Sequence, residues 1–339
     1  MNDLPGRGSH IHLIAICGVG MASLAGLLQS QDYRVTGSDQ NVYPPMSTYL
    51  ERLGIQVLSG FTEEHLRERP QMVVIGNAVS RNNPEVEAVL RLEIPYISFP
   101  QALGKFLIGS KRSVVVAGTH GKTTTSALMA WVLKVAGWHP SFFVGGIPLD
   151  LDSGFNQGTG DWAVLEGDEY DSAFFDKGPK FLHYKPEKVI LTSLEFDHAD
   201  IYRDLEHLKG AFRHLMEIIP PAGTLLACNE YEAAREVALS AGCPVLFYGN
   251  GEPGDWQARN IRARAGCSLF EPFYKGSSEG VVEISLIGRH NVNNALAVYA
   301  TARELGIDQT TLKDALAAFS GVKRRQEVKG EVGGVTVID

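Results

Sequence analysis

The sequence has few cysteines, and no pattern pairs them. Only four of the 339 residues are cysteine, and none forms a C-x-x-C pair, so neither a zinc site nor a disulfide framework is indicated. No apolar run approaches membrane-spanning length, and the start has no basic segment followed by a long apolar core. We therefore expect a reduced, cytoplasmic protein with no signal peptide and no membrane partner.

Positive charge is also in short supply. The chain has 31 Lys and Arg against 39 Asp and Glu, a formal net charge of -8. This balance argues against nucleic acid as a main partner. The hydrophobic content of 44% is ordinary for a globular chain and allows sizeable cores. A chain of this length has room for about two domains.

Apolar strands alternate with helical segments along most of the chain. Residues 11–17, 33–39, 72–78 and 94–99 predict strands, and 18–31 and 83–92 predict helices between them. This order predicts an α/β fold with a Rossmann-like parallel sheet in a first domain over 1–108.

A second alternation begins at residue 113. Strands are predicted at 113–118, 162–168, 188–197 and 223–230, and helices at 291–306 and 312–319. These indicate a central α/β domain of the P-loop ATPase type over 109–322. Residues 332–339 predict a turn into an apolar strand without a partner. We therefore interpret 323–339 as a linker and the start of a truncated third domain.

The first glycine-rich turn is Gly18-Val19-Gly20, after a strand. Such a turn lets backbone N–H groups approach a phosphate at a helix N-terminus. The third position of the dinucleotide fingerprint is Ser23 instead of glycine, while Asp39 lies where a ribose-binding acid would. A dinucleotide site and a turn without a ligand both stay open.

The second turn, "AGTHGKTTT", predicts a phosphate-binding loop. The strict Walker A pattern places a glycine at position 116, which is Val116 here, and the glycine falls at Gly118. The chemistry is retained, because Lys122 can reach β and γ oxygens and the Thr123 hydroxyl can ligate Mg²⁺. A chance Gly-Lys-Thr turn is disfavoured by the apolar strand before it and the helix after it.

Acidic residues follow the next two predicted strands. Glu166 ends one strand, at the sheet edge where ligands bind in open α/β folds, and we predict it to hold the metal. For Asp168, Glu169 and Asp171 we expect a helix N-terminus.

The next cluster contains Asp197, His198 and Asp200, also after an apolar strand. His198 is either a metal ligand or a neutral hydrogen-bonding residue, since histidine is a less common Mg²⁺ ligand than carboxylate.

A later segment, "GRHNVNNALAV", opens a helix with His290, Asn291 and Asn294. Asparagine is a good N-cap, and its amide can also donate to and accept from an adenine edge. Spacing does not decide between the two.

Together these motifs resemble the Mur ligase family. "AGTHGKTTT", "EGDEYD", "EFDHADIY", "GRHNVNNALA" and "FSGVKRR" stand in the family's order and spacing over essentially the whole chain. The resemblance implies an ATP-dependent amide ligase of peptidoglycan metabolism. "GSDQNVYPPMST" and the "DKGPKF" insertion resemble the branch that joins UDP-N-acetylmuramate to L-alanyl-γ-D-glutamyl-meso-diaminopimelate during recycling. The alternative within the family is the branch that adds L-alanine.

The resemblance also implies site residues and a reaction. A carboxylate of the sugar nucleotide attacks the γ-phosphoryl of ATP, and the resulting acyl phosphate is attacked by the peptide amine. The implied catalytic residues are Lys122, Glu166 and His198, and the implied Mg²⁺ ligands are Thr123, Glu166 and His198. ATP would contact Gly118, Thr119, His120, Gly121, Lys122, Thr123, Thr124, His290, Asn291, Asn294 and Arg324. UDP-N-acetylmuramate would contact Gly18, Gly20, Ser38, Asp39, Asn77, Gly145 and Gly146.

Other classes stay open at this point. Because the family continues with a third domain, the resemblance implies that this chain alone lacks activity. It could then act as a non-catalytic UDP-sugar-binding module. An NAD-dependent oxidoreductase would use the first glycine-rich turn, but it would leave the phosphate loop and the acidic strand ends without a role.

Overall fold

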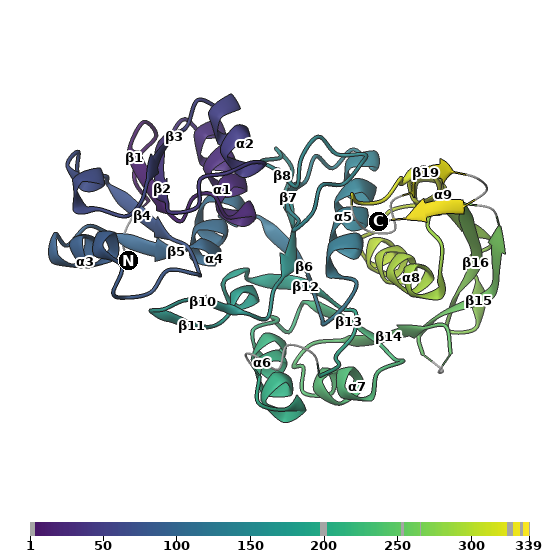
Figure 1. Ribbon diagram of the computed structural model, residues 1–339. Helices are drawn as coiled ribbons and strands as arrows, with labels where there is room; N and C mark the ends of the chain where they lie inside the picture. Colours follow the sequence, from purple (N-terminus) through teal and green to yellow (C-terminus); the bar gives the residue numbers. More distant parts are fainter. Residues whose placement is uncertain are drawn as a thin grey trace. The chain divides into compact units, whose positions relative to one another are not determined.

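The computed structural model describes residues 4–196, 202–251, 254–264, 266–323, 328–332 and 335–338 (Figure 1). It divides into two compact units, Met1–Gly109 with Tyr170–Tyr184, and Ser110–Glu169 with Lys185–Asp339. Segment 170–184 groups with the first unit although the chain on both sides of it belongs to the second. The three predicted domain ranges stay predictions.

A five-stranded parallel sheet with strand order β3-β2-β1-β4-β5 forms the first unit. The central strand β1 is buried along its whole length, as expected for an apolar run between two neighbours. The elements are β1 (His10–Ile14), α1 (Val19–Ser30), β2 (Arg34–Asp39), α2 (Met46–Arg52), β3 (Gln56–Ser59), η1 (Glu63–Leu66), β4 (Met72–Ile75), α3 (Pro84–Arg91), β5 (Tyr96–Ser98), α4 (Phe99–Ala102) and η2 (Leu103–Ile108). The predicted parallel α/β sheet is confirmed.

A hairpin completes this unit and corrects one prediction. Asp171 begins a strand, not a helix: the segment forms β10 (Asp171–Ala173), β11 (Asp176–Pro179) and η3 (Lys180–His183). Asp171 Oδ1 accepts the Gly178 N–H at 3.0 Å across the hairpin. The Phe175 ring packs edge-on against Tyr96 of β5, with centroids 4.9 Å apart. Aromatic packing of the hairpin therefore outweighs the local preference of acids for a helix start.

An eleven-stranded sheet forms the second unit, with strand order β17-β16-β15-β14-β13-β12-β6-β9-β7-β8 and β18 paired to β16. The seven neighbouring strands β15-β14-β13-β12-β6-β9-β7 run parallel, as predicted for this region. The pairs at the two edges, such as β15 with β16 and β7 with β8, are antiparallel. The elements are β6 (Arg112–Ala117), α5 (Lys122–Val135), β7 (Ser141–Phe143), β8 (Phe155–Asn156), β9 (Trp162–Gly167), β12 (Pro186–Leu191), α6 (Leu205–Glu217), β13 (Thr224–Cys228), α7 (Glu232–Ala238), β14 (Val245–Gly249), β15 (Trp256–Arg264), β16 (Cys267–Tyr274), β17 (Ser277–Ser278), β18 (Val282–Ile284), α8 (Arg289–Glu304), α9 (Gln309–Ala318), β19 (Val328–Val332) and β20 (Val335–Ile338).

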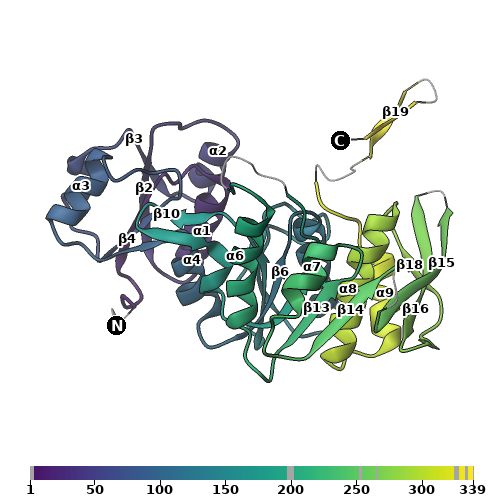
Figure 2. The ribbon, with the colours of Figure 1, turned by 90° about the horizontal axis from the view of Figure 1, so that it is seen from below.

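Helices cover both faces of the parallel part of this sheet. α6 and α7 lie on one face, and α5, α8 and α9 lie on the other (Figure 1; Figure 2). The Trp131 indole N–H of α5 donates to the Ala315 carbonyl of α9 at 2.9 Å, within a large buried apolar cluster. Strand β6 stands between β9 and β12, so the chain leaves it at the point where the strand order reverses. Ligands of open α/β sheets bind at such a point.

Two further findings concern the end of the chain and the membrane. The strand predicted near the end does have a partner, since β20 pairs with β19 in an antiparallel hairpin. Among the residues that the structure describes, no helix combines the length and the apolar character needed to cross a bilayer.

Candidate active site

The predicted phosphate loop lies between β6 and α5, and its two glycines have positive φ angles. Gly118 has φ +137°, and a Cβ there would lie 2.3 Å from Thr192 Oγ1. Gly121, the N-cap of α5, has φ +80°, and a Cβ there would lie 2.7 Å from Asn294 Oδ1. Both positions therefore need glycine. The first N–H groups of α5 have no intrahelical partner and suit an anion.

The end of strand β12 holds this loop in place. The Thr192 hydroxyl donates to the His120 carbonyl at 2.6 Å, and the His120 N–H donates to Ser193 Oγ at 2.8 Å. The Thr119 N–H donates to the Ser193 carbonyl at 3.0 Å. Our sequence reasoning missed both Thr192 and Ser193, which directly follow β12. The available signal was two hydroxyl side chains directly after an apolar strand.

Lys122 is the first residue of α5 and is largely enclosed. Its Nζ donates to the Gly118 carbonyl at 2.6 Å and lies 2.9 and 3.1 Å from the two carboxylate oxygens of Glu169. The exposed fractions of the two side chains are 13% and 1%. Burial raises the pKa of the Glu169 carboxyl, and the Lys122 charge acts against that rise. The sequence pointed to Lys122 but not to this partner.

Two of the predicted metal ligands are in direct contact. The Thr123 hydroxyl donates to Glu166 Oε1 at 2.9 Å, and the Gly145 N–H donates to Glu166 Oε2 at 2.7 Å. A Cβ on Gly146 would lie 2.9 Å from the Thr123 methyl group, so both predicted glycines lie close to this pair. A hydroxyl and a carboxylate are oxygen donors that fit a hard cation such as Mg²⁺. Within the described ranges, no group of three or more His, Cys, Asp or Glu could hold a metal.

The start of α8 brings one of its predicted residues to the phosphate loop. The Asn294 side chain lies against Gly121, and its amide donates to Asn291 Oδ1 at 3.3 Å. Asn291 in turn donates to the Ile287 carbonyl at 2.8 Å. Both asparagines are buried, whereas His290 is exposed. The asparagines therefore connect α8 to the loop, and the contact with adenine stays a prediction.

The remaining predicted nucleotide residues fall into two groups. Thr119 is buried, Thr124 is half-buried, and His120 is exposed beside the loop. His198 and Arg324 lie outside the described residues.

The first glycine-rich turn has a different construction. Gly18, the N-cap of α1, has an ordinary φ of -63°. The carboxylate of Asp39 accepts the Cys17 N–H and the Asn41 N–H, each at 2.9 Å. Asn77 is exposed just after β4. Gly20 faces the Phe99 ring, where a Cβ would lie 3.1 Å from Cζ.

Ser38 points away from the turn, into a buried polar network below the sheet. Its hydroxyl donates to Glu85 Oε2 at 2.5 Å, and His12 Nε2 lies 2.9 Å from Glu85 Oε1. His12 Nδ1 and His10 Nε2 each lie 2.7 Å from the Thr36 hydroxyl. Burial, together with the Arg34 charge, lowers the pKa of His10 to about 4. The Ser38 side chain therefore links β2 to Glu85 of α3 and does not face the turn.

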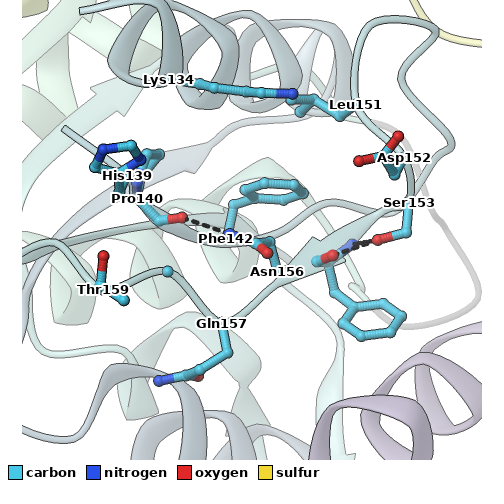
Figure 3. Close-up of a pocket in the computed structure, with 12 residues that line it drawn as sticks. Lys134, His139, Pro140, Phe142, Leu151, Asp152, Ser153, Asn156, Gln157 and Thr159 are labelled. Carbon is cyan, nitrogen blue, oxygen red and sulfur yellow. Dashed lines mark hydrogen bonds between the residues drawn. The ribbon is translucent and has the colours of Figure 1, made fainter. Parts of the chain in front are cut away.

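A separate cavity of about 310 Å³ lies beside β7 and β8 (Figure 3). Lys134 and Asp152 border it, and the Asn156 amide donates to the Pro140 carbonyl at 3.0 Å. Lys134 is near the end of α5, roughly 20 Å of helix away from Lys122 at its start. None of the predicted site residues lines this cavity.

Comparisons with known proteins show which family the chain resembles. Residues 10–111 match the model described as Mur ligase family, catalytic domain, and residues 116–302 match the Mur ligase middle domain. The chain is 44% identical over 329 residues to UDP-N-acetylmuramate–L-alanyl-γ-D-glutamyl-meso-2,6-diaminoheptandioate ligase of Escherichia coli (strain K12). The aligned region covers 97% of this chain and 71% of that protein. It is 35% identical to a UDP-N-acetylmuramate–L-alanine ligase of Carboxydothermus hydrogenoformans over 97% of this chain and 69% of that protein.

A solved structure is similar over nearly all of both chains. The crystal structure of UDP-N-acetylmuramate:L-alanyl-γ-D-glutamyl-meso-diaminopimelate ligase from Neisseria meningitides superposes with a TM-score of 0.86 at 40% identity. It covers 93% of this chain and 99% of that one. The chain therefore belongs to the Mur ligase family of ATP-dependent amide ligases.

Proposed function

We propose that this chain acts in the ATP-dependent joining of UDP-N-acetylmuramate to L-alanyl-γ-D-glutamyl-meso-diaminopimelate. The observation that carries the proposal is the placement of Lys122 and Thr123, which open α5 directly after the phosphate loop, beside Glu166 of β9 at the same carboxyl edge of the sheet. Identity of 44% to a relative named for this reaction supports the choice of substrates.

The reaction needs an activated carboxylate, because a carboxylate is a poor electrophile. The lactyl carboxylate of the sugar nucleotide attacks the γ-phosphorus of ATP, and ADP leaves. The peptide amine then attacks the acyl phosphate carbon, and inorganic phosphate leaves. Two anions meet in the first step, so Lys122 would neutralise charge on the transferring phosphoryl group.

The nucleotide would lie along the phosphate loop. Gly118, Gly121 and the N–H groups that open α5 would surround its phosphates, with Thr119, His120 and Thr124 beside them. Asn291 and Asn294 would contact adenine together with His290, and Arg324 would approach the phosphates.

One Mg²⁺ would be held by Thr123 and Glu166, and His198 would serve a second ion. When bound there, Mg²⁺ supplies positive charge against the phosphate oxygens. The oxygen donors of Thr123 and Glu166 fit such an ion, and phosphates and water would complete its shell.

The sugar nucleotide would use the first glycine-rich turn. Gly18 and Gly20 would let the backbone of this turn approach the diphosphate. Asp39 has lone pairs left for a ribose hydroxyl, and Asn77 is exposed just after the neighbouring strand β4. Ser38 would act indirectly, by fixing β2. Gly145 and Gly146 would line the path of the muramyl group to the Thr123–Glu166 pair.

Isothermal titration tests the division of roles. The chain should bind UDP-N-acetylmuramate in preference to UDP-N-acetylglucosamine, and should bind ATP with Mg²⁺. Lys122→Ala should weaken ATP binding by about tenfold to a hundredfold, since a charged hydrogen bond to phosphate is lost, and should leave the sugar nucleotide unaffected. Loss of sugar-nucleotide binding in Lys122→Ala would contradict the assignment.

Because the resemblance implies that the chain alone lacks activity, turnover is measured in a version extended by the family's third domain, where it separates the two branches of the family. Phosphate release that depends on the tripeptide supports the proposal. Release that depends on L-alanine alone would favour the L-alanine ligase, to which the chain is 35% identical.

A further inference from the structure

The ammonium group of Lys122 already has an anionic partner in this structure. Both carboxylate oxygens of Glu169 lie within 3.1 Å of Nζ, and the carbonyl of Gly118 lies at 2.6 Å. The Thr119 carbonyl is a further neighbour at 3.4 Å. An ammonium has three N–H donors, so these oxygens together account for all of them.

Glu169 is held firmly in this position. It is buried, with an exposed fraction of 1%, and the Tyr202 hydroxyl donates to its backbone carbonyl at 2.5 Å. The next residue, Tyr170, begins the segment that groups with the first unit. Glu169 is therefore a fixed carboxylate at the phosphate loop, and it differs from Glu166, whose oxygens accept from Thr123 and Gly145.

A phosphate that arrives at the loop must compete for the same ammonium. While Glu169 pairs with Lys122, the lysine charge is largely compensated, and its donors face the carboxylate and the loop carbonyls. A nucleotide phosphate can use the lysine only if Nζ turns from Glu169 to the phosphate oxygens. This leaves the buried Glu169 carboxylate without its counterion, and the cost of breaking the ion pair opposes nucleotide binding.

We infer that Glu169 is the resident counterion of Lys122, a positioning residue that holds the lysine in the loop until nucleotide phosphates replace it. This inference rests on the proposed nucleotide site and adds a residue that sets its affinity. The exchange forms and breaks no covalent bond: one ion pair replaces another.

The test compares Glu169→Gln with the wild-type chain in titrations with ADP and with pyrophosphate, with and without Mg²⁺. Removal of the competing charge should tighten binding of both probes by about three- to tenfold. UDP-N-acetylmuramate binding should not change. A merely structural role would predict the opposite sign, since a disturbed loop binds phosphate less well.

Two further variants make the result specific. Glu187→Gln is the matched control, because Glu187 pairs with Arg112 at the amino end of β12, away from the phosphate loop, and it should leave both probes unaffected. In a Lys122→Ala background, Glu169→Gln should give no tightening, because the lysine that it restrains is gone. If Glu169→Gln fails to fold, Glu169→Asp withdraws the carboxylate by one carbon and should tighten binding by a smaller factor.

The outcomes are distinct. Tightening in the single variant and none in the double variant support the inference. Unchanged or weaker binding of ADP and pyrophosphate by folded Glu169→Gln or Glu169→Asp overturns it while the nucleotide site stands. No nucleotide binding by the wild-type chain would overturn the proposed function and this inference together.

Discussion

The two glycine-rich turns look alike in sequence, but different side-chain groups stabilise them. Both connect a central strand to a helix, β1 to α1 and β6 to α5. A carboxylate, Asp39, accepts backbone N–H groups beside the first turn. The hydroxyl groups of Thr192 and Ser193, which directly follow β12, hold the second, and its cation is Lys122. Asp39 beside the first turn therefore suits a hydroxyl group of a ligand, whereas Lys122 at the second suits phosphates.

The backbone of the two turns differs as well, and this gives the largest expected effect. Gly118→Ala should destabilise the second unit by about 3 kcal/mol, since its φ of +137° and the 2.3 Å approach to Thr192 both oppose a methyl group. Gly18→Ala should cost less than about 1 kcal/mol, because its φ is -63° and the nearest atom to a Cβ is 3.7 Å away. Urea unfolding of both variants gives the two values.

The same pair of variants can break the comparison. If Gly18→Ala proved as destabilising as Gly118→Ala, the two turns would share one conformational requirement. Ser80→Ala, at an exposed position outside both turns, is the control substitution and should leave the midpoint of urea unfolding unchanged.

A smaller effect is expected from the carboxylate of the first turn. Asp39→Asn keeps one acceptor oxygen but turns an NH₂ group toward one of the two backbone N–H groups. One N–H group then lacks its partner, at a cost of about 1 to 2 kcal/mol, and the turn loosens. Titration should show UDP-N-acetylmuramate binding weakened by about tenfold and ATP binding unchanged. Equal weakening of both ligands would contradict separate roles for the turns.

The sequence predicted many of the strands and helices of both units, because the spacing of apolar residues reflects which side chains are buried. The runs at 72–78 and 113–118 appear as β4 and β6, and the segment at 291–306 appears as α8. The motifs likewise predicted that Thr123 and Glu166 lie close together. Glu166 is near the carboxyl end of β9, and Thr123 is in the first turn of α5, which follows the neighbouring parallel strand β6.

The prediction failed where side chains from distant segments decide the structure. The acids after Glu166 lead into a hairpin, because Phe174 and Phe175 pack against the first unit, a contact that no local pattern encodes. The pairing of Glu169 with Lys122 spans 47 positions and left no mark in the spacing of either motif. Ser38 as a ligand contact stays a prediction, whereas the hydrogen bond of its hydroxyl to Glu85, 47 positions away, had no signal in the sequence.

The smallest expected effect concerns the buried polar network of β1, β2 and α3 and its response to acid. Burial lowers the pKa of His10 to about 4, against 6.5 for an ordinary histidine. Below pH 6.5 the unfolded chain therefore binds a proton at His10 that the folded chain does not, so stability falls as the pH drops from about 6.5 to 4 and not further. His10→Gln should lose less unfolding free energy than the wild type between pH 7 and pH 4.5, because it has no proton to take up. Hydrogen exchange should place the difference in β1 and β2 and leave β6 and β12 unaffected, since the network lies under the first sheet alone. An identical loss in both proteins would show that His10 titrates normally, and the acid response of the first unit would then have to come from its other titratable groups.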